Sequence, residues 1–65
     1  MPIKFILHQQ ELTLEADQIP AAEALRVLNL PPESYLMVRD GEMILEETVL
    51  HAGDEIRLVP VIAGG

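Results

Sequence analysis

The chain of 65 residues contains no cysteine and no tryptophan, and only one tyrosine and one phenylalanine. Without cysteine it has no disulfide, no thiolate metal ligand and no thiol nucleophile. No stretch approaches the roughly 20 apolar residues of a membrane-spanning helix, and no basic segment precedes an apolar run as in a signal peptide. These absences predict a cytoplasmic protein that does not bind membranes.

Basic residues are also scarce. Four lysines and arginines stand against eleven acidic residues, which gives a net charge of −7. Such a chain repels the phosphates of nucleic acids, so direct nucleic-acid binding is not expected. The charge either favours partner proteins with basic surfaces or only keeps a small domain in solution.

The spacing of apolar residues in the first half predicts two strands and a helix. Alternation over residues 3–8 and 11–16 indicates strands on either side of a polar break at Gln9 and Gln10. Residues 20–28 follow a helical period, with Pro20 expected at the first helical position and Asn29 as a left-handed terminator.

The second half predicts a hairpin and a last strand. An Asp40-Gly41 pair between apolar runs is a strong signal for a two-residue turn. The segment EETVL is expected to be an irregular connection anchored by Leu50. A turn at Gly53 and Asp54 then precedes a strand that contains Ile56 and Leu58.

The strand before the Asp40-Gly41 turn has apolar residues on both faces, so its orientation is inferred from Arg39. If Arg39 points to solvent, Leu36 and Val38 face the helix. Tyr35 and Met37 are then expected on the solvent side.

The order strand, strand, helix, strand, short strand, strand predicts an α+β fold, in which one helix covers one face of a mixed sheet. A single domain of this size forms one small core and has no room for an enclosed active site. The expected core residues are Ile3, Phe5, Leu7, Leu12, Leu14, Leu25, Leu28, Leu36, Val38, Leu50, Ile56 and Leu58.

Residues that usually carry catalysis are few. Ser34 is the only serine and lacks a G-x-S-x-G context. His8 and His51 do not have zinc-motif spacing. The acidic pairs Glu46-Glu47 and Asp54-Glu55 are typical of a solvated surface. We therefore predict no catalytic residue, no metal site and no bound cofactor.

The last residues, PVIAGG, are unusual for the end of a fold. Glycine has no side chain to pack and loses much backbone entropy on ordering. The last strand is expected to stop near Pro60, which cannot donate a ladder hydrogen bond. From there six residues can extend about 20 Å. We expect a domain over residues 1–61 and a flexible tail over 62–65 that enters a narrow tunnel of another protein. A frayed end without a role is the alternative.

The segments VRDGEMI and LHAGDEIRLVPVIAGG resemble the ubiquitin-like β-grasp sulfur carriers of the ThiS/MoaD family. The resemblance is greatest to the short carriers of tRNA thiolation and to archaeal ubiquitin-like modifiers. It implies a β-grasp fold, in which a mixed sheet of four to five strands packs on one helix. It also implies a carrier that is not itself an enzyme and is a monomer on its own.

The resemblance implies a chemistry for Gly65. An ATP-dependent adenylating enzyme of the ubiquitin-activating type would join the Gly65 carboxylate to AMP. A persulfide sulfur would then displace AMP and leave a thiocarboxylate. The implied partners are this enzyme, which uses the ATP, a sulfurtransferase or other persulfide donor, and a downstream sulfur-accepting synthase.

Two contact regions are expected. The tail that enters the partner's active site consists of Val61, Ile62, Ala63, Gly64 and Gly65. A docking patch is expected from apolar residues that face away from the helix. Its expected members are Ile6, Val59, Val61, Tyr35 and Met37, and its expected acidic rim is Asp40, Glu42, Asp54 and Glu55.

The residues leave other functions open. A ubiquitin-like modifier would use the same activation and join Gly65 to a target lysine, although the single lysine, Lys4, argues against chains of this protein on itself. An acidic interaction domain with a passive tail is a third possibility. For a carrier, the pathway can be tRNA thiolation, thiamine thiazole synthesis or molybdopterin synthesis.

Overall fold

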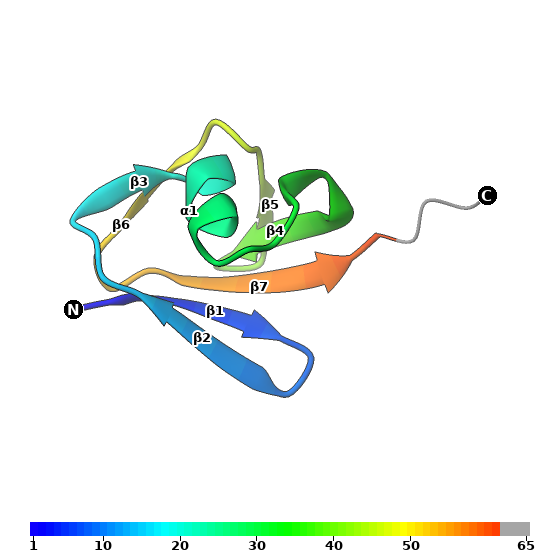
Figure 1. The fold of residues 1–65 in the computed structure, drawn as a ribbon, viewed down its shortest axis with the longest axis horizontal. Coiled ribbons are helices and arrows are strands. Elements are labelled where there is room, and N and C mark those ends of the chain that lie inside the picture. The colour runs from blue at the N-terminus through cyan, green and yellow to red at the C-terminus, as the bar shows by residue number, and fades with distance from the viewer. Residues whose placement is uncertain (62–65) are drawn as a thin grey trace.

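The computed structural model describes residues 1–61 and shows a sheet, a short helix and a small second pair of strands (Figure 1). The strands are β1 (Ile3–Leu7), β2 (Gln10–Leu14), β3 (Gln18–Pro20), β4 (Tyr35–Arg39), β5 (Glu42–Ile44), β6 (Val49–His51) and β7 (Glu55–Pro60). The helices are α1 (Ala21–Val27) and the 3-10 helix η1 (Pro32–Ser34).

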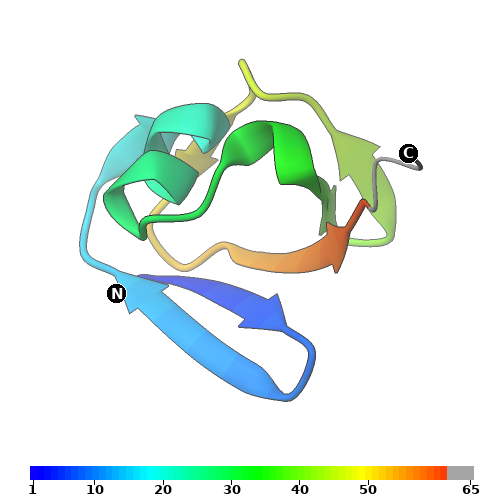
Figure 2. The ribbon, with the colours of Figure 1, turned by 45° about the vertical axis from the view of Figure 1, so that its right-hand side comes forward.

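The main sheet has the strand order β2-β1-β7-β4-β5. Its central pair, β1 and β7, is parallel, and all of its other pairs are antiparallel. A parallel pair needs a long crossover connection, and here the connection contains α1. The helix covers one face of the sheet (Figures 1 and 2). The predicted two-layer α+β architecture, a mixed sheet on one helix, is confirmed.

The helix begins one residue later than predicted. Pro20 has an extended backbone, with ψ at 142°, and it is the N-cap residue and the end of β3. Its side chain makes no capping hydrogen bond. Backbone carbonyls of the connection after β5 replace the cap: Ala21 N–H donates to Thr48 at 2.8 Å, and Ala22 N–H donates to Glu46 at 2.9 Å.

The end of the helix follows the prediction. Asn29 has a φ of 64°. Leu30 N–H donates to Leu25 at 2.8 Å and Asn29 N–H to Arg26 at 3.0 Å, which is the Schellman pattern of bonds. Asparagine is one of the few residues that accept this left-handed position without a large steric cost.

The pairing of β3 with β6 was not predicted. Ile19 lies opposite Leu50, and Leu50 is fully buried. The segment over residues 45–51 is therefore partly strand instead of an irregular connection. Leu50 is its buried anchor, as predicted.

The core lies between the sheet and α1. Phe5 is at its centre, opposite Leu12 on β2 and Ile56 on β7, and both Phe5 and Ile56 are fully buried. The buried residues that form this core are Ile3, Phe5, Ala21, Ala24, Leu25, Met37, Leu50, Ile56 and Leu58. Four other residues that we expected in the core, Leu7, Leu12, Leu14 and Leu28, are partly buried and pack against it.

The predicted orientation of β4 is wrong. Met37 is 2% exposed and lies opposite the buried Leu58. Leu36 is 45% exposed, and Val38 points to the same side because side chains alternate along a strand. Leu36 and Val38 therefore leave the core list and Met37 enters it.

The reason for this error is the position of Arg39. It lies opposite Ile56, so its side chain is on the helix side of the sheet, but at the end of the strand. Its guanidinium Nη1 is 3.1 Å from the Asp54 carboxylate and 3.3 Å from the Val49 carbonyl. The same Asp54 oxygen accepts the His51 N–H at 2.9 Å. Because these two groups accept hydrogen bonds from the guanidinium, Arg39 can lie half-buried on the helix side and does not have to point to solvent.

Both hairpins have two-residue turns that contain residues with positive φ. Asp40 and Gly41 have φ values of 53° and 81°, as the predicted type I′ hairpin requires. In the first hairpin the turn residues are His8 and Gln9, not Gln9 and Gln10, because Gln10 already pairs with Leu7. His8 takes the positive φ of 59° there.

The orientation of β4 can be tested by comparing two neighbours. Met37→Ala is expected to lower the free energy of unfolding by about 2–5 kcal/mol, since it leaves a cavity in the core. Leu36→Ala is expected to cost less than about 1 kcal/mol because its side chain is half in water. Urea denaturation of both variants measures the difference, and the reverse order would contradict the assigned orientation.

The hairpin turn can be tested at Gly41. A Cβ at this position would meet no atom within 4 Å, so only the backbone conformation opposes it. Gly41→Ala is expected to lower the free energy of unfolding by about 1 kcal/mol through the positive φ. Gly41→Asn, the matched variant that tolerates this φ, is expected to cost less. Equal stability of Gly41→Ala and the parent in urea would exclude the type I′ conformation.

Candidate functional site

The candidate site begins where the last strand ends. Pro60 is the final paired residue of β7 and lies opposite Tyr35. Val61 N–H then donates to the Ser34 carbonyl at 2.8 Å. This bond ties the chain to η1 at the end of the sheet away from the N-terminus (Figure 1). The predicted roles of Ile62, Ala63, Gly64 and Gly65 concern residues outside the described range, as does the predicted tail over 62–65.

The face of the sheet opposite α1 is called the outer face here. Because side chains alternate along a strand, the strand registers align every second residue of the five strands on this face. Its residues are Lys4 and Ile6 on β1, Glu11 and Thr13 on β2, Leu36 and Val38 on β4, Met43 on β5, and Glu55, Arg57 and Val59 on β7.

Five of these residues are apolar and form what we call the outer apolar patch: Ile6, Leu36, Val38, Met43 and Val59. Leu36 lies opposite Val59, and Val38 opposite Met43. Met43 is 64% exposed and Val59 is 39% exposed. A group of exposed apolar side chains on so small a domain is typical of a partner surface.

The predicted docking residues are only partly on this face. Ile6 and Val59 lie on it, and Val61, 43% exposed, follows directly after β7. Met37 is buried in the core, so it cannot belong to an exposed patch. Tyr35 is half-buried, packs against the core and lies on the helix side of β4.

The residues missed from the sequence are Leu36, Val38 and Met43. The first two were assigned to the core because Arg39 was assigned to solvent. The sequence carried one signal: every residue of YLMV is apolar, so neither orientation of β4 leaves the outer face polar.

Charged groups border the outer apolar patch at the β4–β5 turn. A shallow hollow there is lined by Ile6, Val38, Asp40, Gly41, Glu55 and Arg57. Two of the predicted acidic rim residues, Asp40 and Glu55, thus border the hollow. Asp54 does not, since its carboxylate is held by Arg39 and the His51 N–H. Glu42 lies opposite Arg39, on the helix side.

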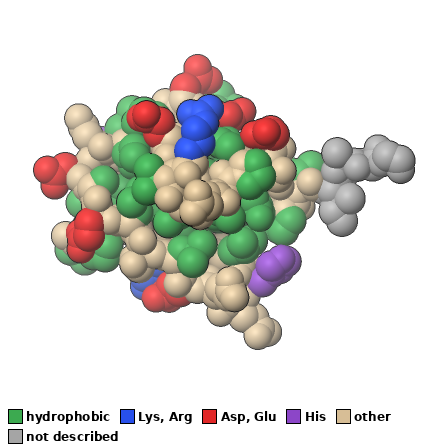
Figure 3. Space-filling view, in the orientation of Figure 1, with side chains coloured by type: hydrophobic (Ala, Val, Ile, Leu, Met, Phe, Trp, Pro, Cys, Tyr) green, Lys and Arg blue, Asp and Glu red, His purple; other side chains and the backbone are tan. Residues whose placement is uncertain are grey.

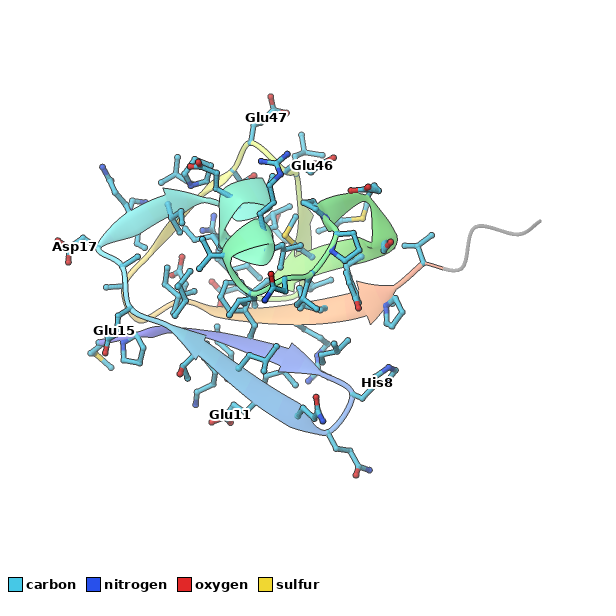
Figure 4. All side chains as sticks on the ribbon, viewed as in Figure 1. His8, Glu11, Glu15, Asp17, Glu46 and Glu47 are labelled. Carbon is cyan, nitrogen blue, oxygen red and sulfur yellow. The ribbon has the colours of Figure 1, made fainter. Side chains whose placement is uncertain are left out.

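The remaining polar candidates do not converge. His8 lies in the β1–β2 turn, far from Glu46 and Glu47 on the connection after β5 (Figure 4). The Ser34 carbonyl, not its hydroxyl, makes the bond to Val61. Within residues 1–61 no three His, Asp or Glu side chains lie close enough to hold a metal ion. In the same range no helix has the length and apolar character needed to cross a membrane.

Comparison with known proteins agrees with this fold. The crystal structure of the thiamine biosynthesis protein ThiS from Geobacter metallireducens is 19% identical, with a TM-score of 0.65, and the match covers 95% of this chain and 99% of the other. Caldiarchaeum subterraneum ubiquitin is also 19% identical, with a TM-score of 0.60, over 100% of this chain and 98% of the other. No curated protein sequence matches the chain.

The family comparison is more specific. The ThiS family matches residues 3–65, which includes the terminal Gly64 and Gly65. Proteins of this family are carriers on which enzymes act, and they are not enzymes themselves. A match over almost the whole chain shows that this protein belongs to the ThiS family of ubiquitin-like sulfur carriers.

Proposed function

We propose that the carboxylate of Gly65 is the sulfur-carrying group of this protein. The observation that carries the proposal is that the ThiS family match runs through Gly65. The fold adds support, because Val61 lies at the end of the sheet, where its N–H bonds to the Ser34 carbonyl, four residues before Gly65. Four further residues can span at most about 14 Å, and two of them are glycines with no Cβ to widen the chain.

In this proposal the Gly65 carboxylate is converted to a thiocarboxylate in three steps. An activating enzyme transfers AMP from ATP to the Gly65 carboxylate and releases pyrophosphate. The terminal sulfur of a partner's persulfide attacks the acyl carbon, AMP leaves, and an acyl disulfide forms. A second thiol of the partner then attacks the other sulfur of that disulfide and releases the thiocarboxylate. Because this chain has no cysteine, it has no thiol that could attack the activated acyl group.

Family membership implies a partner of the ThiF type, which is the activating enzyme of this system. We propose that this enzyme docks on the outer apolar patch, with Val61 at the entrance to its active site. The patch is apolar and partly exposed, and it includes residues of β7, from which the chain end departs, and of the two neighbours of β7, β1 and β4. The sulfur donor and the sulfur-accepting synthase are then the later partners.

Among the sulfur-accepting pathways, we propose thiazole formation in thiamine synthesis. The support is the family description and the similar Geobacter metallireducens protein, whose description names thiamine biosynthesis. Restored growth without thiamine, when the gene is supplied to a bacterium that lacks its own carrier of this type, would support it. Rescue of a tRNA-thiolation or molybdopterin defect alone would replace it by those pathways.

A second candidate function is protein modification. It is favoured by the structural match to an archaeal ubiquitin over the whole chain. In this case Gly65 would form an isopeptide bond with a target lysine. The only lysine of this chain is Lys4, on the outer face, and its Nζ lies 3.8 Å from the Glu11 Oε2.

The carrier function predicts a change in mass. When the protein is incubated with ATP, its adenylating enzyme and a persulfide donor, intact-mass spectrometry should show one oxygen replaced by sulfur. The variant that lacks Gly65 should stay unchanged, because its new terminus no longer reaches the site of adenylation. A set of conjugates on other proteins supports the modifier instead. An unchanged mass in the full chain would contradict both functions.

The docking surface predicts a second result. Leu36→Ala keeps the fold but removes an exposed apolar contact, so kcat/KM for adenylation should fall about 10- to 30-fold, mainly through a higher KM. Thr13→Ala, on the outer face but on the edge strand β2, is the matched control and should leave the rate unchanged. Pyrophosphate release measures both. Equal rates for the two variants would move the docking surface elsewhere.

A further inference from the structure

A groove at the edge of the sheet adjoins the outer face and shares Leu36 and Met43 with the outer apolar patch. It lies where η1 and the start of β4 approach β5 and the residues after it. Of the residues that line it, Pro32 and Met37 are buried and Ile44 is half-buried. Leu45, 63% exposed, lies at its border, and Val61 lines it as well. We call it the edge groove.

The edge groove is apolar apart from two carboxylates. Glu33 on η1 and Glu46 on the connection after β5 are its charged lining residues, and no lysine or arginine lines it. Both glutamates are exposed. Within residues 1–61 the ion pairs are Lys4–Glu11 and Arg39–Asp54, so neither Glu33 nor Glu46 has a cationic partner there. Figure 3 shows acidic side chains along the upper and left-hand borders of one face of the molecule.

The groove also exposes part of a strand edge. β5 is the last strand of the sheet, so one of its sides is open. The two-residue turn makes Arg39 and Glu42 the hydrogen-bonded pair that closes the hairpin. Since bonded pairs alternate, the N–H and C=O of Met43 point away from β4.

Within the described residues, Met43 is the residue of β5 whose N–H and C=O both face the open side. Leu45 N–H donates to Thr48 Oγ1 at 3.1 Å, and the Leu45 carbonyl accepts the Thr48 N–H at 3.1 Å. The Glu46 carbonyl accepts the Ala22 N–H. A partner strand can therefore form one short pair of backbone bonds here, and side chains must supply the rest of the affinity.

We propose that the edge groove binds an extended, basic segment of the activating enzyme. The segment pairs with the backbone of Met43, places an apolar side chain over Met37 and Ile44, and positions a lysine or arginine between Glu33 and Glu46. This proposal rests on the proposed function, because it deepens how the carrier is recognised. Extended segments commonly add to open sheet edges, where backbone bonds are combined with side-chain pockets.

The position of the edge groove and its negative charge favour the activating enzyme as its occupant. Val61 directly follows β7 and lines the groove, so an enzyme that holds the following residues in its active site lies beside the groove. Two unpaired carboxylates on a chain of net charge −7 attract cationic side chains. A second copy of this chain would bring the same carboxylates and the same net charge to the contact, and would be repelled.

The charge contribution is tested with paired variants. Glu33→Gln combined with Glu46→Gln removes both groove charges. Glu15→Gln combined with Asp17→Asn removes two exposed charges at the opposite end of the molecule (Figure 4), so both double variants have the same net charge as each other. Affinity is measured by calorimetric titration with the adenylating enzyme in the presence of ATP and Mg²⁺. The groove double variant should bind with a Kd about tenfold or more above that of the parent. The Kd of the control double variant should differ from that of the parent by less than about twofold.

The backbone contribution is tested at Met43. Met43→Pro removes the N–H on the open side without touching the β4 ladder, a place where strands tolerate proline. Met43→Ala removes the side chain but keeps the N–H, so the difference between the two variants isolates the backbone bond. Met43→Pro should bind more weakly than Met43→Ala. Urea denaturation checks that both variants are folded under the conditions of the titration.

The outcomes separate the two proposals. If the parent is thiolated but the groove pair and Met43→Pro bind like their controls, the groove proposal is wrong and the proposed function stands. If the parent neither binds the adenylating enzyme nor gains sulfur, both are wrong. If sedimentation shows a dimer of the parent that Met43→Pro abolishes, the occupant is a second copy of this chain.

Discussion

The parallel pairing of β1 with β7 is the contact on which the rest of the structure depends. It joins the first and last strands of the chain and places Phe5 beside Ile56 and Leu7 beside Leu58. All of the other main-sheet strands pair with this central pair directly or through one neighbour. The register therefore decides which side chains of β2, β4 and β5 face the helix. Beyond this pairing β7 continues along β4 to Pro60, at the sheet end where Val61 bonds to η1.

The sequence allowed the elements with strong local signals to be predicted. Alternation fixed the inward faces of β1 and β7, Asn29 fixed the helix end, and Asp40-Gly41 fixed the hairpin. It could not orient β4, because both faces of YLMV are apolar and only the partner strand β7 distinguishes them. The β3–β6 pair also escaped prediction, since two strands of three residues carry no period and depend on tertiary contact.

The candidate functional site was likewise predictable from the sequence only in part. The terminal glycines are visible in the sequence because no packing argument explains them. The outer apolar patch could be predicted only in part, since its centre lies on β4, whose orientation was unknown. The edge groove could not be predicted at all. It joins η1, β5 and Val61, which are far apart in the chain and meet only because β4 lies between β5 and β7.

A small acidic domain thus has two surfaces that share Leu36 and Met43, and a chain end whose proposed reactive group is a carboxylate. The most direct measurement is the structure of the complex between this protein and its adenylating enzyme, with Gly65 joined to a stable analogue of the acyl adenylate. The account predicts the outer apolar patch and the edge groove against the enzyme, with the chain after Val61 running into the ATP site. An enzyme docked on the α1 side of the domain would contradict it.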